Sequence, residues 1–330
     1  MLFHWNERTD PAYNLALEEI MAEQSDEPFA MIWQNRPSVI IGRNQNAYAE
    51  FDGAYVREHG ISVVRRTTGG GAVYHDLGNV NYTLLAFATD SDPRYTDFAV
   101  LAAPVVEALK SLGAEAEFSG RNDILVGGRK VSGSAKRVHD GRILFHGTLL
   151  FDADMDAMAA ALTPSRDKIE AKGVASVRAR VANLREFLPQ FELETFPRAF
   201  ADALKNRLGI AETTPIHDNW IREAERLADE RYRSWDWTFG ESPDFTFERT
   251  AKFPGGTVTA HLDIHQGLIR RARFTGDFFG ASPATELAEA LTGCPHRFES
   301  LCETLRRLEP ERFIDGATVE SLAELLSPRI

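Results

Sequence analysis

The stretch from residue 114 to residue 151 constrains the fold most, because it predicts several strands in direct succession. Short apolar runs are separated by turn signals at Gly120, at the Gly127-Gly128 pair and at Asp140 followed by glycine. Glycine in such positions allows the backbone to close a tight hairpin. Strands joined by hairpins pair antiparallel, whereas parallel strands need a longer crossover connection. We therefore predict a β-meander here and an α+β fold, not a βαβ series.

The length of the chain predicts more than one domain. It has 330 residues, of which 43% are hydrophobic and 26% are charged, so it is globular in composition but long for one core. The aromatic stretch RYRSWDWTFGESP ends in Gly, Ser and Pro, which is typical of a boundary. We predict one domain over residues 1–242 and a second over residues 243–330.

Periodicity predicts the other elements of the first domain. Asp10 is a candidate N-cap and Pro11 suits the first helical position, so a helix is expected from about 11 to 24. Two short β-branched or aromatic runs follow, at 29–35 and 38–44, and we expect them to be neighbouring strands. The remaining expected elements are a strand over NVNYTLLAFA and helices over 95–112, where Pro104 makes the boundary uncertain, and near 154–162, 196–208 and 217–230.

The last part of the chain predicts a small α+β domain, because strand patterns come first and helical patterns follow. The expected strands lie near 245–252, 256–264 and 268–275, and the expected helices near 283–292, 296–308 and 317–326.

Charge and hydropathy exclude several classes of protein. The formal net charge of -12 argues against a general nucleic-acid binder, which needs a basic surface to displace counterions, so any anionic ligand must be held by a local basic site. No apolar run approaches the roughly 20 residues that span a bilayer, and the N-terminus lacks the regions of a signal peptide. We expect a cytoplasmic protein with no nucleic-acid or membrane partner.

The cysteines suggest no special chemistry. Cys294 and Cys302 are the only two, and they have no CxxC spacing, which disfavours a structural zinc site or a disulfide framework. We expect two small, partly buried side chains on C-terminal helices.

Residues 65–79, RRTTGGGAVYHDLGN, form the first candidate site. Arg65 and Arg66 stand just before three consecutive glycines, in a loop expected between strands. Such a loop lets backbone amides approach an anion while arginine neutralises it. The spacing is neither that of a Walker loop nor that of a GxGxxG motif opening a helix. A flexible turn is the alternative interpretation.

Residues 121–135, RNDILVGGRKVSGSA, form the second candidate site, with Lys130 after a Gly-Gly turn. Basic residues outnumber acids between 121 and 142, which makes this stretch a candidate anion site, although composition alone slightly favours a solvated hairpin. The six basic residues are Arg121, Arg129, Lys130, Lys136, Arg137 and Arg142, against Asp123 and Asp140. Ser132 and Ser134 lack the GxSxG context of a serine nucleophile.

Together with FHGTLL (145–150), these two motifs closely resemble those of lipoate-protein ligases, in the same order along the chain. The similarity continues through NLALEE (14–19), IIGRNQN (40–46) and AKGVASVRARVANL (171–184), and reaches the WDWTFGESP region. It implies a biotin/lipoate-ligase-like catalytic domain, with a mixed β-sheet and flanking helices, followed by a small α+β accessory domain.

The resemblance also implies roles for individual residues. Lys130 falls on the catalytic lysine of the family. The residues implied in ATP and lipoyl-AMP binding are Arg66, Gly71, Ala72, Val73, Tyr74, Asp123 and Lys130, and those implied in the lipoate pocket are Glu18, Trp33, His75 and His146. Without the resemblance, Trp33 and His146 would be read as core residues. The turn before Lys130 is shorter than in some relatives, and no metal ligand is predicted.

The activity that the resemblance implies uses ATP and Mg²⁺ to activate lipoate as lipoyl-AMP. The lipoyl group then passes to a lysine of lipoyl domains of 2-oxoacid dehydrogenases or of glycine cleavage H-type proteins.

An octanoyl or lipoyl transferase of the same superfamily is the nearest competing activity, but cysteine-dependent transferases need a thiol that the first domain lacks. The lipoate-type motif at 65–79 argues against a biotin ligase. A non-catalytic lipoate-binding module is disfavoured because the chain retains both Arg66 and Lys130.

Overall fold

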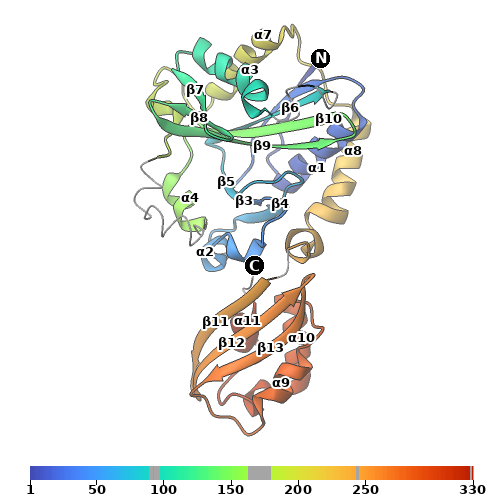
Figure 1. Cartoon of the computed structure of the whole chain (residues 1–330), viewed down its shortest axis with the longest axis vertical. Helices are drawn as coiled ribbons and strands as arrows, with labels where there is room; N and C mark the ends of the chain where they lie inside the picture. Colours follow the sequence, from blue (N-terminus) through green and yellow to red (C-terminus); the bar gives the residue numbers. More distant parts are fainter. Residues whose placement is uncertain (89–91, 93–96, 163–179, 243–244, 328, 330) are drawn as a thin grey trace. The chain divides into compact units, whose positions relative to one another are not determined.

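The computed structural model describes residues 1–88, 92, 97–162, 180–242, 245–327 and 329 (Figure 1). Contacts between residues divide the chain into two compact units. Unit 1 contains residues 1–43 and 62–234, and unit 2 contains residues 44–61 and 235–330. The segment 44–61 therefore packs with the C-terminal part of the chain, although it precedes most of unit 1 in sequence. The domain boundary between 242 and 243 stays a prediction.

Unit 1 is built on a seven-stranded mixed sheet with the order β1-β2-β6-β10-β9-β8-β7. β1 and β2 are parallel, and the other neighbouring strands are antiparallel. The last four of these strands along the sequence, β7 to β10, form the expected meander, which is thereby confirmed. The strands are β1 Leu2–Trp5, β2 Phe29–Trp33, β6 Asn79–Phe87, β7 Ala116–Ser119, β8 Asp123–Val126, β9 Arg129–His139 and β10 Arg142–Leu150.

A second, three-stranded sheet in unit 1 has the order β4-β3-β5, with β3 Ser38–Ile41, β4 Ser62–Arg65 and β5 Val73–His75. The expectation that β2 and β3 are neighbours is wrong, because they lie in different sheets. The chain leaves the large sheet after Trp33, and β3 pairs instead with strands that follow it in sequence. Short apolar runs predict strands but not their partners, since partner choice depends on contacts distant in the sequence.

The helices of unit 1 agree with the sequence patterns. α1 spans Pro11–Gln24, the Asp10 side chain accepts from the Ala12 amide, and the helix is buried from Pro11 to Ala22. Pro104 lies inside a continuous helix, so it does not end it. The other helices are α3 Phe98–Ser111, α4 Met155–Ala161, α7 Phe196–Leu208 and α8 Asp218–Leu227.

The two faces of the large sheet differ in character. On one face Phe145 of β10 makes an edge contact with Phe98 of α3, and Tyr82 of β6 lies 6.4 Å from Phe200 of α7 between ring centroids. These rings belong to an apolar core. Because side chains alternate along a strand, the adjacent residues Thr83 and His146 point to the other face. The candidate site lies on that face.

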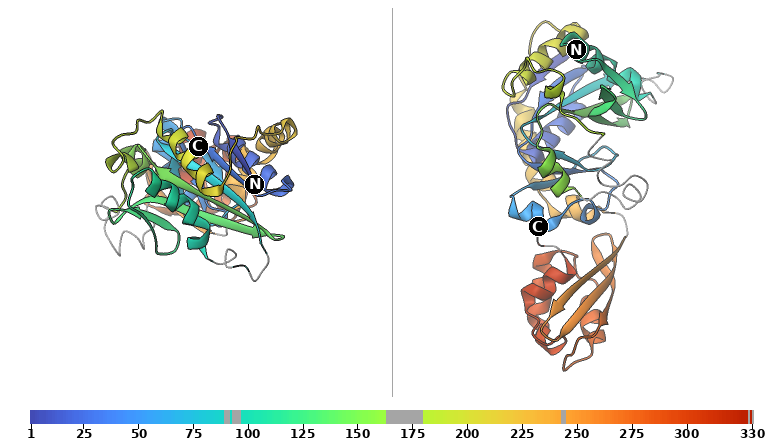
Figure 2. Two further views of the ribbon diagram at one scale, coloured as in Figure 1. Left: turned by 90° about the horizontal axis from the view of Figure 1, so that it is seen from above. Right: turned by 90° about the vertical axis from the view of Figure 1, so that its left-hand side faces the viewer.

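Unit 2 has an antiparallel three-stranded sheet with helices on one side, which Figure 2 shows as two layers. This confirms the small C-terminal α+β arrangement. α2 was not predicted from the sequence. The elements are η1 Ala47–Ala49, α2 Gly53–Glu58, β11 Phe245–Phe253, β12 Gly256–His265, β13 Leu268–Gly276, α9 Ala284–Ala290, α10 Phe298–Leu308 and α11 Val319–Leu326. Among the helices that the structure describes, none is long and apolar enough to cross a membrane.

Candidate active site

A cavity of about 250 Å³ opens on the polar face of the large sheet in unit 1. Its wall combines residues from the sheet with the glycine loop between β4 and β5. Eight of the residues singled out from the sequence lie on this wall, namely Trp33, Arg66, Gly71, Ala72, Val73, His75, Lys130 and His146. The motifs at 65–79 and 121–135, which are far apart in the sequence, therefore line the same cavity.

The other three predicted residues lie close to the cavity without forming its wall. Glu18 is buried behind His146 and accepts a hydrogen bond from it. Asp123 forms an ion pair with Lys130. Tyr74 is buried, and strand alternation turns its side chain away from the side that Val73 and His75 occupy.

Arg66 holds the glycine loop in shape. Its Nη2 donates to the carbonyls of Gly69 and Gly71, at 2.7 and 2.8 Å, and its Nη1 donates to Ile40 O at 3.1 Å. Burial lowers the pKa of Arg66 to about 10, so the guanidinium remains charged at neutral pH. Arg65 is also buried, but it is not part of the cavity wall. A positive charge therefore stands next to the loop amides.

Gly42 is needed where β3 leads toward the glycine loop. A Cβ at Gly42 would lie 2.0 Å from the carbonyl oxygen of Gly70, which is closer than any side chain allows. Gly70 itself has a φ of +93°, in the region that favours glycine. The loop can approach the end of β3 because Gly42 lacks a side chain, and Gly70 supplies the positive φ.

Glu18 organises the buried polar groups beneath the cavity. His146 Nδ1 lies 2.9 Å from both carboxylate oxygens of Glu18, and Thr83 donates to one of them at 2.6 Å. Trp33 Nε1 donates to Thr83 Oγ1 at 2.9 Å. A carboxylate can only accept hydrogen bonds, so His146 carries a proton on Nδ1. The indole and imidazole rings are thus held in fixed positions.

The same network continues to the glycine loop through Thr68. Its hydroxyl lies 2.7 Å from His146 Nε2 and accepts from Arg66 Nε at 3.0 Å. Attraction to Glu18 opposes the lowering of the Arg66 pKa by burial. A fully paired buried network of this kind is rigid, because each member would lose its partner if another moved.

Lys130 is the second residue of β9. The backbone of Lys130 pairs with residues 180–182, which lie near the end of the AKGVASVRARVANL motif. Residues 171–179 of that motif lie outside the described part of the chain. The ammonium of Lys130 lies 2.7 Å from Asp123 Oδ1, and the two side chains are 36% and 35% exposed. Both side chains are partly exposed, and ion pairs of this kind contribute little to stability.

His75 is a neutral residue in the cavity wall. Burial, assisted by the charge of Arg66 and by His146, lowers its pKa to about 3. Its Nδ1 lies 3.0 Å from Asn35 Nδ2, and its Nε2 is buried without a partner in the part of the chain that the structure describes. The cavity thus offers a charged lysine, a charged arginine and an uncharged imidazole.

Sequence comparison assigns the family. Residues 10–205 match the family described as "Lipoyl protein ligase A/B catalytic domain", and residues 242–326 match "Bacterial lipoate protein ligase C-terminus". Lipoate–protein ligase 1 of Staphylococcus aureus is 40% identical over 326 residues, which cover 98% of this chain and 98% of that protein. The chain belongs to the lipoate-protein ligases. It is an enzyme with ligase activity, as the motifs predicted.

Solved structures of lipoate-protein ligases share this fold. A bipartite ligase from Thermoplasma acidophilum, studied with its E2 lipoyl domain, is 30% identical with a TM-score of 0.65, covering 73% of this chain and 97% of that one. A lipoate-protein ligase A determined with bound ATP is 29% identical with a TM-score of 0.63, covering 73% and 100%. The predicted fold class, a lipoate-ligase catalytic domain with a C-terminal domain, is confirmed.

Several residues of this ligase site were missed from the sequence. Thr68, Thr83 and Asn35 take part in its buried networks, and Asn81 lies on the cavity wall. β6 carried a signal that could have found two of them. Asn79, Asn81 and Thr83 alternate with apolar residues, yet all three are buried. Buried polar residues on one face of a strand commonly mark a site, because burying them elsewhere is costly.

Proposed function

We propose that this ligase uses ATP to activate lipoate as lipoyl-AMP and then transfers the lipoyl group to a lysine of an acceptor protein. The observation that carries the proposal is the meeting of the Arg66 loop and Lys130 on one cavity wall. The names of the relatives and the ATP-bound neighbour support it.

In the first step, a carboxylate oxygen of lipoate attacks the α-phosphorus of ATP, and pyrophosphate leaves with the electrons of the broken P–O bond. Lys130 is placed to contact both the carboxylate and the α-phosphate once they replace Asp123. Its charge favours the oxygens on which negative charge develops, so catalysis consists mainly of positioning and electrostatic stabilisation.

The glycine loop is proposed to bind the nucleotide and the adenylate. Gly71, Ala72 and Val73 line the cavity beside the charged Arg66, and the backbone amides of such a loop can bind phosphate oxygens. Tyr74 is proposed to act through its backbone at the end of this loop. Asp123, next to Lys130, is proposed to lie near the nucleotide.

Mg²⁺ is proposed to enter with ATP. The described residues contain no group of three His, Cys, Asp or Glu side chains able to hold a metal ion by themselves. Mg²⁺ in nucleotide enzymes is commonly bound by phosphates with one or two carboxylates, and Asp123 is a carboxylate suited to that role. The ion would neutralise phosphate charge as pyrophosphate leaves.

The apolar tail of lipoate is proposed to lie against Trp33. The Glu18 network fixes Trp33 and His146 through their polar atoms, and both residues belong to the cavity wall. A site with apolar walls and few, well-placed polar groups is typical for small ligands. We propose that the residues around the acyl group are Glu18, Trp33, His75 and His146.

In the second step, the unprotonated amine of the acceptor lysine attacks the acyl carbon, and AMP leaves with the electrons of the anhydride bond. Lys130 can stabilise the carbonyl oxygen again as the tetrahedral intermediate forms. We propose lipoyl domains of 2-oxoacid dehydrogenases and glycine cleavage H-type proteins as acceptors. The Thermoplasma ligase and its E2 lipoyl domain support the first of these. The cytoplasmic location also stays a prediction.

A cysteine-dependent transferase of the same superfamily would need a nucleophilic thiol. Both cysteines belong to unit 2, where they are buried in its core, and burial raises the pKa of each thiol. A thiol with a raised pKa is a poor nucleophile. The lysine-based mechanism therefore fits the chain better.

Pyrophosphate exchange tests the proposal. Purified protein with Mg-ATP should exchange labelled pyrophosphate when lipoate is added and not when biotin is added, and an octanoate sample should show how strictly the tail is selected. Mass spectrometry of an added lipoyl domain would detect the transfer step. A folded sample without exchange at any lipoate concentration would refute the proposed activity.

A further inference from the structure

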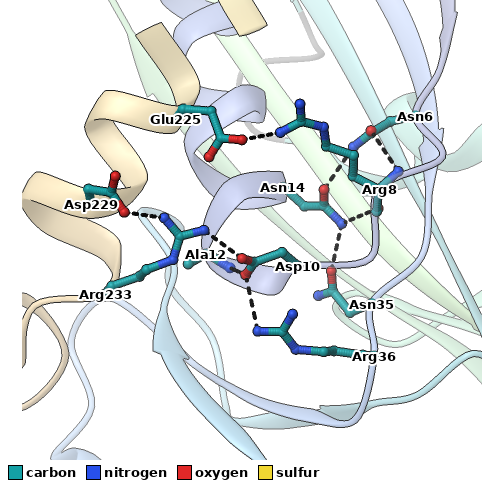
Figure 3. A network of polar contacts seen from close by, with 10 residues as sticks. All are labelled: Asn6, Arg8, Asp10, Ala12, Asn14, Asn35, Arg36, Glu225, Asp229 and Arg233. Atoms are coloured by element: carbon teal, nitrogen blue, oxygen red, sulfur yellow. Dashed lines mark hydrogen bonds and ion pairs between the residues drawn. The ribbon is translucent and has the colours of Figure 1, made fainter. Parts of the chain in front are cut away.

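We infer that the side-chain amides of Asn6, Asn14 and Asn35 fix the tautomer of His75, so that its Nε2–H is held in the cavity as an uncharged donor for an anionic oxygen of the ligand. The three asparagines lie just before α1, within α1 and just after β2 (Figure 3). The identity of the ligand rests on the proposed function, whereas the tautomer follows from this chain's own hydrogen bonds.

The direction of the first bond is set by the backbone. The Arg8 amide N–H donates to Asn6 Oδ1 at 3.1 Å, and a backbone amide cannot accept in return. The oxygen of Asn6 is thereby identified, so its Nδ2 is the atom that lies 2.8 Å from Asn14 Oδ1 and donates to it.

The orientation of Asn14 is identified a second time, independently of Asn6. Its Nδ2 lies 2.9 Å from the carbonyl oxygens of Arg8 and Gln34, which can only accept. Were the amide turned over, its oxygen would face both carbonyls and repel them. The same Nδ2 lies 2.8 Å from Asn35 Oδ1, so the oxygen of Asn35 faces Asn14.

The hydrogen bond between Asn35 and His75 decides which nitrogen of His75 carries the proton. With its oxygen toward Asn14, Asn35 presents Nδ2 to His75 Nδ1 at 3.0 Å. An amide nitrogen only donates, so Nδ1 must accept, and a neutral imidazole that accepts on Nδ1 carries its proton on Nε2. The opposite tautomer would place two N–H groups face to face in the protein interior.

Ion pairs with α8 and the residues that follow it hold this segment in place. Asp10 pairs with Arg233 at 2.5 Å and with Arg36 at 3.6 Å, and Arg8 pairs with Glu225 (Figure 3). Asn14 and Asn35 are fully buried, so water does not compete for their amides. The three amides therefore stay in the arrangement that sets His75.

The unpaired Nε2 of His75, at the end of this series of hydrogen bonds, suggests a ligand contact. His75 is 4% exposed and lines the cavity, yet its Nε2 has no partner in the described part of the chain. Buried donors are nearly always paired, so an unpaired one at a cavity wall suits an acceptor that arrives with the substrate. Its pKa, lowered by burial and by Arg66, keeps the ring neutral. An uncharged donor can hold a carboxylate or phosphate oxygen while Lys130 supplies the charge.

Nitrogen NMR of the full-length protein with ¹⁵N-labelled histidine tests the tautomer directly. The resonances of His75 are assigned by their loss in His75→Gln. We expect a protonated Nε2 and an unprotonated Nδ1, while His146 in the same spectrum should show a protonated Nδ1 because it donates to Glu18. A protonated Nδ1 on His75 in the wild-type protein would overturn the inference.

The variant Asn35→Asp tests whether the three asparagine amides set the tautomer of His75. A carboxylate at this position accepts only, so the His75 proton should move to Nδ1, and kcat/KM for pyrophosphate exchange should fall about tenfold or more. Asn206→Asp adds the same charge at an exposed position of α7 and should change neither the tautomer nor the activity. An unchanged His75 tautomer in folded Asn35→Asp protein would contradict the proposed control.

Two ligand titrations distinguish the oxygen that His75 binds. Lipoate without nucleotide should shift the Nε2 resonance if the carboxylate is the acceptor, and a non-hydrolysable ATP analogue should shift it if a phosphate is. His75→Gln, which can offer an amide N–H, should retain more activity than His75→Leu. If neither bound ligand shifts Nε2, the donor role is refuted. Failure of pyrophosphate exchange alone, with the expected tautomer and shifts, would refute the proposed activity and not this inference.

Discussion

The interiors of the two units differ in what they bury. Unit 1 places charged and polar side chains under its cavity, among them Glu18, Arg66, His75 and His146. The core of unit 2 is formed by apolar side chains from its sheet and helices. Burying polar groups costs stability unless they are hydrogen-bonded, so the buried charged residues beside the cavity of unit 1 indicate a site. The match of residues 10–205 to a family described as a catalytic domain agrees with a site in unit 1.

The two units also use buried histidine differently. His75 lines the cavity and its Nε2 has no partner in the described part of the chain, whereas His296 donates from Nε2 to the carbonyl of Leu326 at 2.6 Å. Burial lowers the pKa of both rings, to about 3 and about 4. Burial thus keeps both rings neutral, but His75 is a candidate ligand contact in unit 1 and His296 makes a structural contact in unit 2.

Removal of the Lys130 ammonium should have the largest effect on activity. Lys130→Ala should lower pyrophosphate exchange by a hundredfold or more, which corresponds to ~3 kcal/mol in the barrier, as for the loss of an oxyanion donor. Lys130→Arg should also be impaired, because a planar guanidinium is wider than an ammonium. The thermal midpoint should change little, since the side chain is 36% exposed. Lys110→Ala, at an exposed ion pair on α3, is the control and should remain active.

Breaking the Glu18 network should affect both stability and activity. Glu18→Ala leaves His146 Nδ1 and the Thr83 hydroxyl without their buried acceptor, so we expect a loss of about 2–4 kcal/mol in the free energy of unfolding and a lower kcat/KM. Glu23→Ala, at a half-exposed position of the same helix, should cost less than about 0.5 kcal/mol. Denaturant unfolding measures both, and equal losses would contradict the assigned role of Glu18.

Acid should destabilise both units through their buried histidines. A histidine whose pKa is lowered by folding is neutral in the native state, so its stabilising contribution is complete above the unfolded pKa of 6.5 and is lost as the pH falls. At pH 5 each ring should cost about 2 kcal/mol, at about 1.36 kcal/mol per pH unit. The loss from His296 should end near pH 4, and that from His75 nearer pH 3.

His296→Gln separates the two contributions. The variant should show a weaker dependence of unfolding free energy on pH between 6.5 and 4, because one proton fewer is taken up on unfolding. The measurement is denaturant unfolding followed at several pH values. An unchanged slope would show that His296 is already protonated in the folded protein.

Replacement of the cysteines should have the smallest effect on catalysis. The Cys294→Ser, Cys302→Ser double variant should keep turnover within a few-fold, with a loss of roughly 1 kcal/mol per buried site. Ligation of lipoate to an acceptor domain at saturating ATP provides the measurement. A folded but inactive double variant, together with an active Lys130→Ala, would favour a thioester transferase.

Local elements were predicted well because their causes are local. Asp10 and Pro11 mark the start of α1, which the structure places at Pro11. Gly127 and Gly128 both adopt positive φ, as a tight hairpin before Lys130 requires. The partner of β3 and the packing of residues 44–61 with unit 2 were not predicted, because neither leaves a periodic pattern in the sequence.

The sequence by itself determined the α-helices other than α2, the antiparallel meander and the motifs that place this chain among the lipoate-protein ligases. Only the tertiary structure decided that Glu18, His146 and Thr68 connect to Arg66, and that three asparagines set the proton of His75. Two of these bonds, Asn14 with Asn35 and Glu18 with His146, join residues that are 21 and 128 positions apart in the chain. Hydrogen-bond direction depends on the distance and orientation of such groups, which follow from packing and not from residue order.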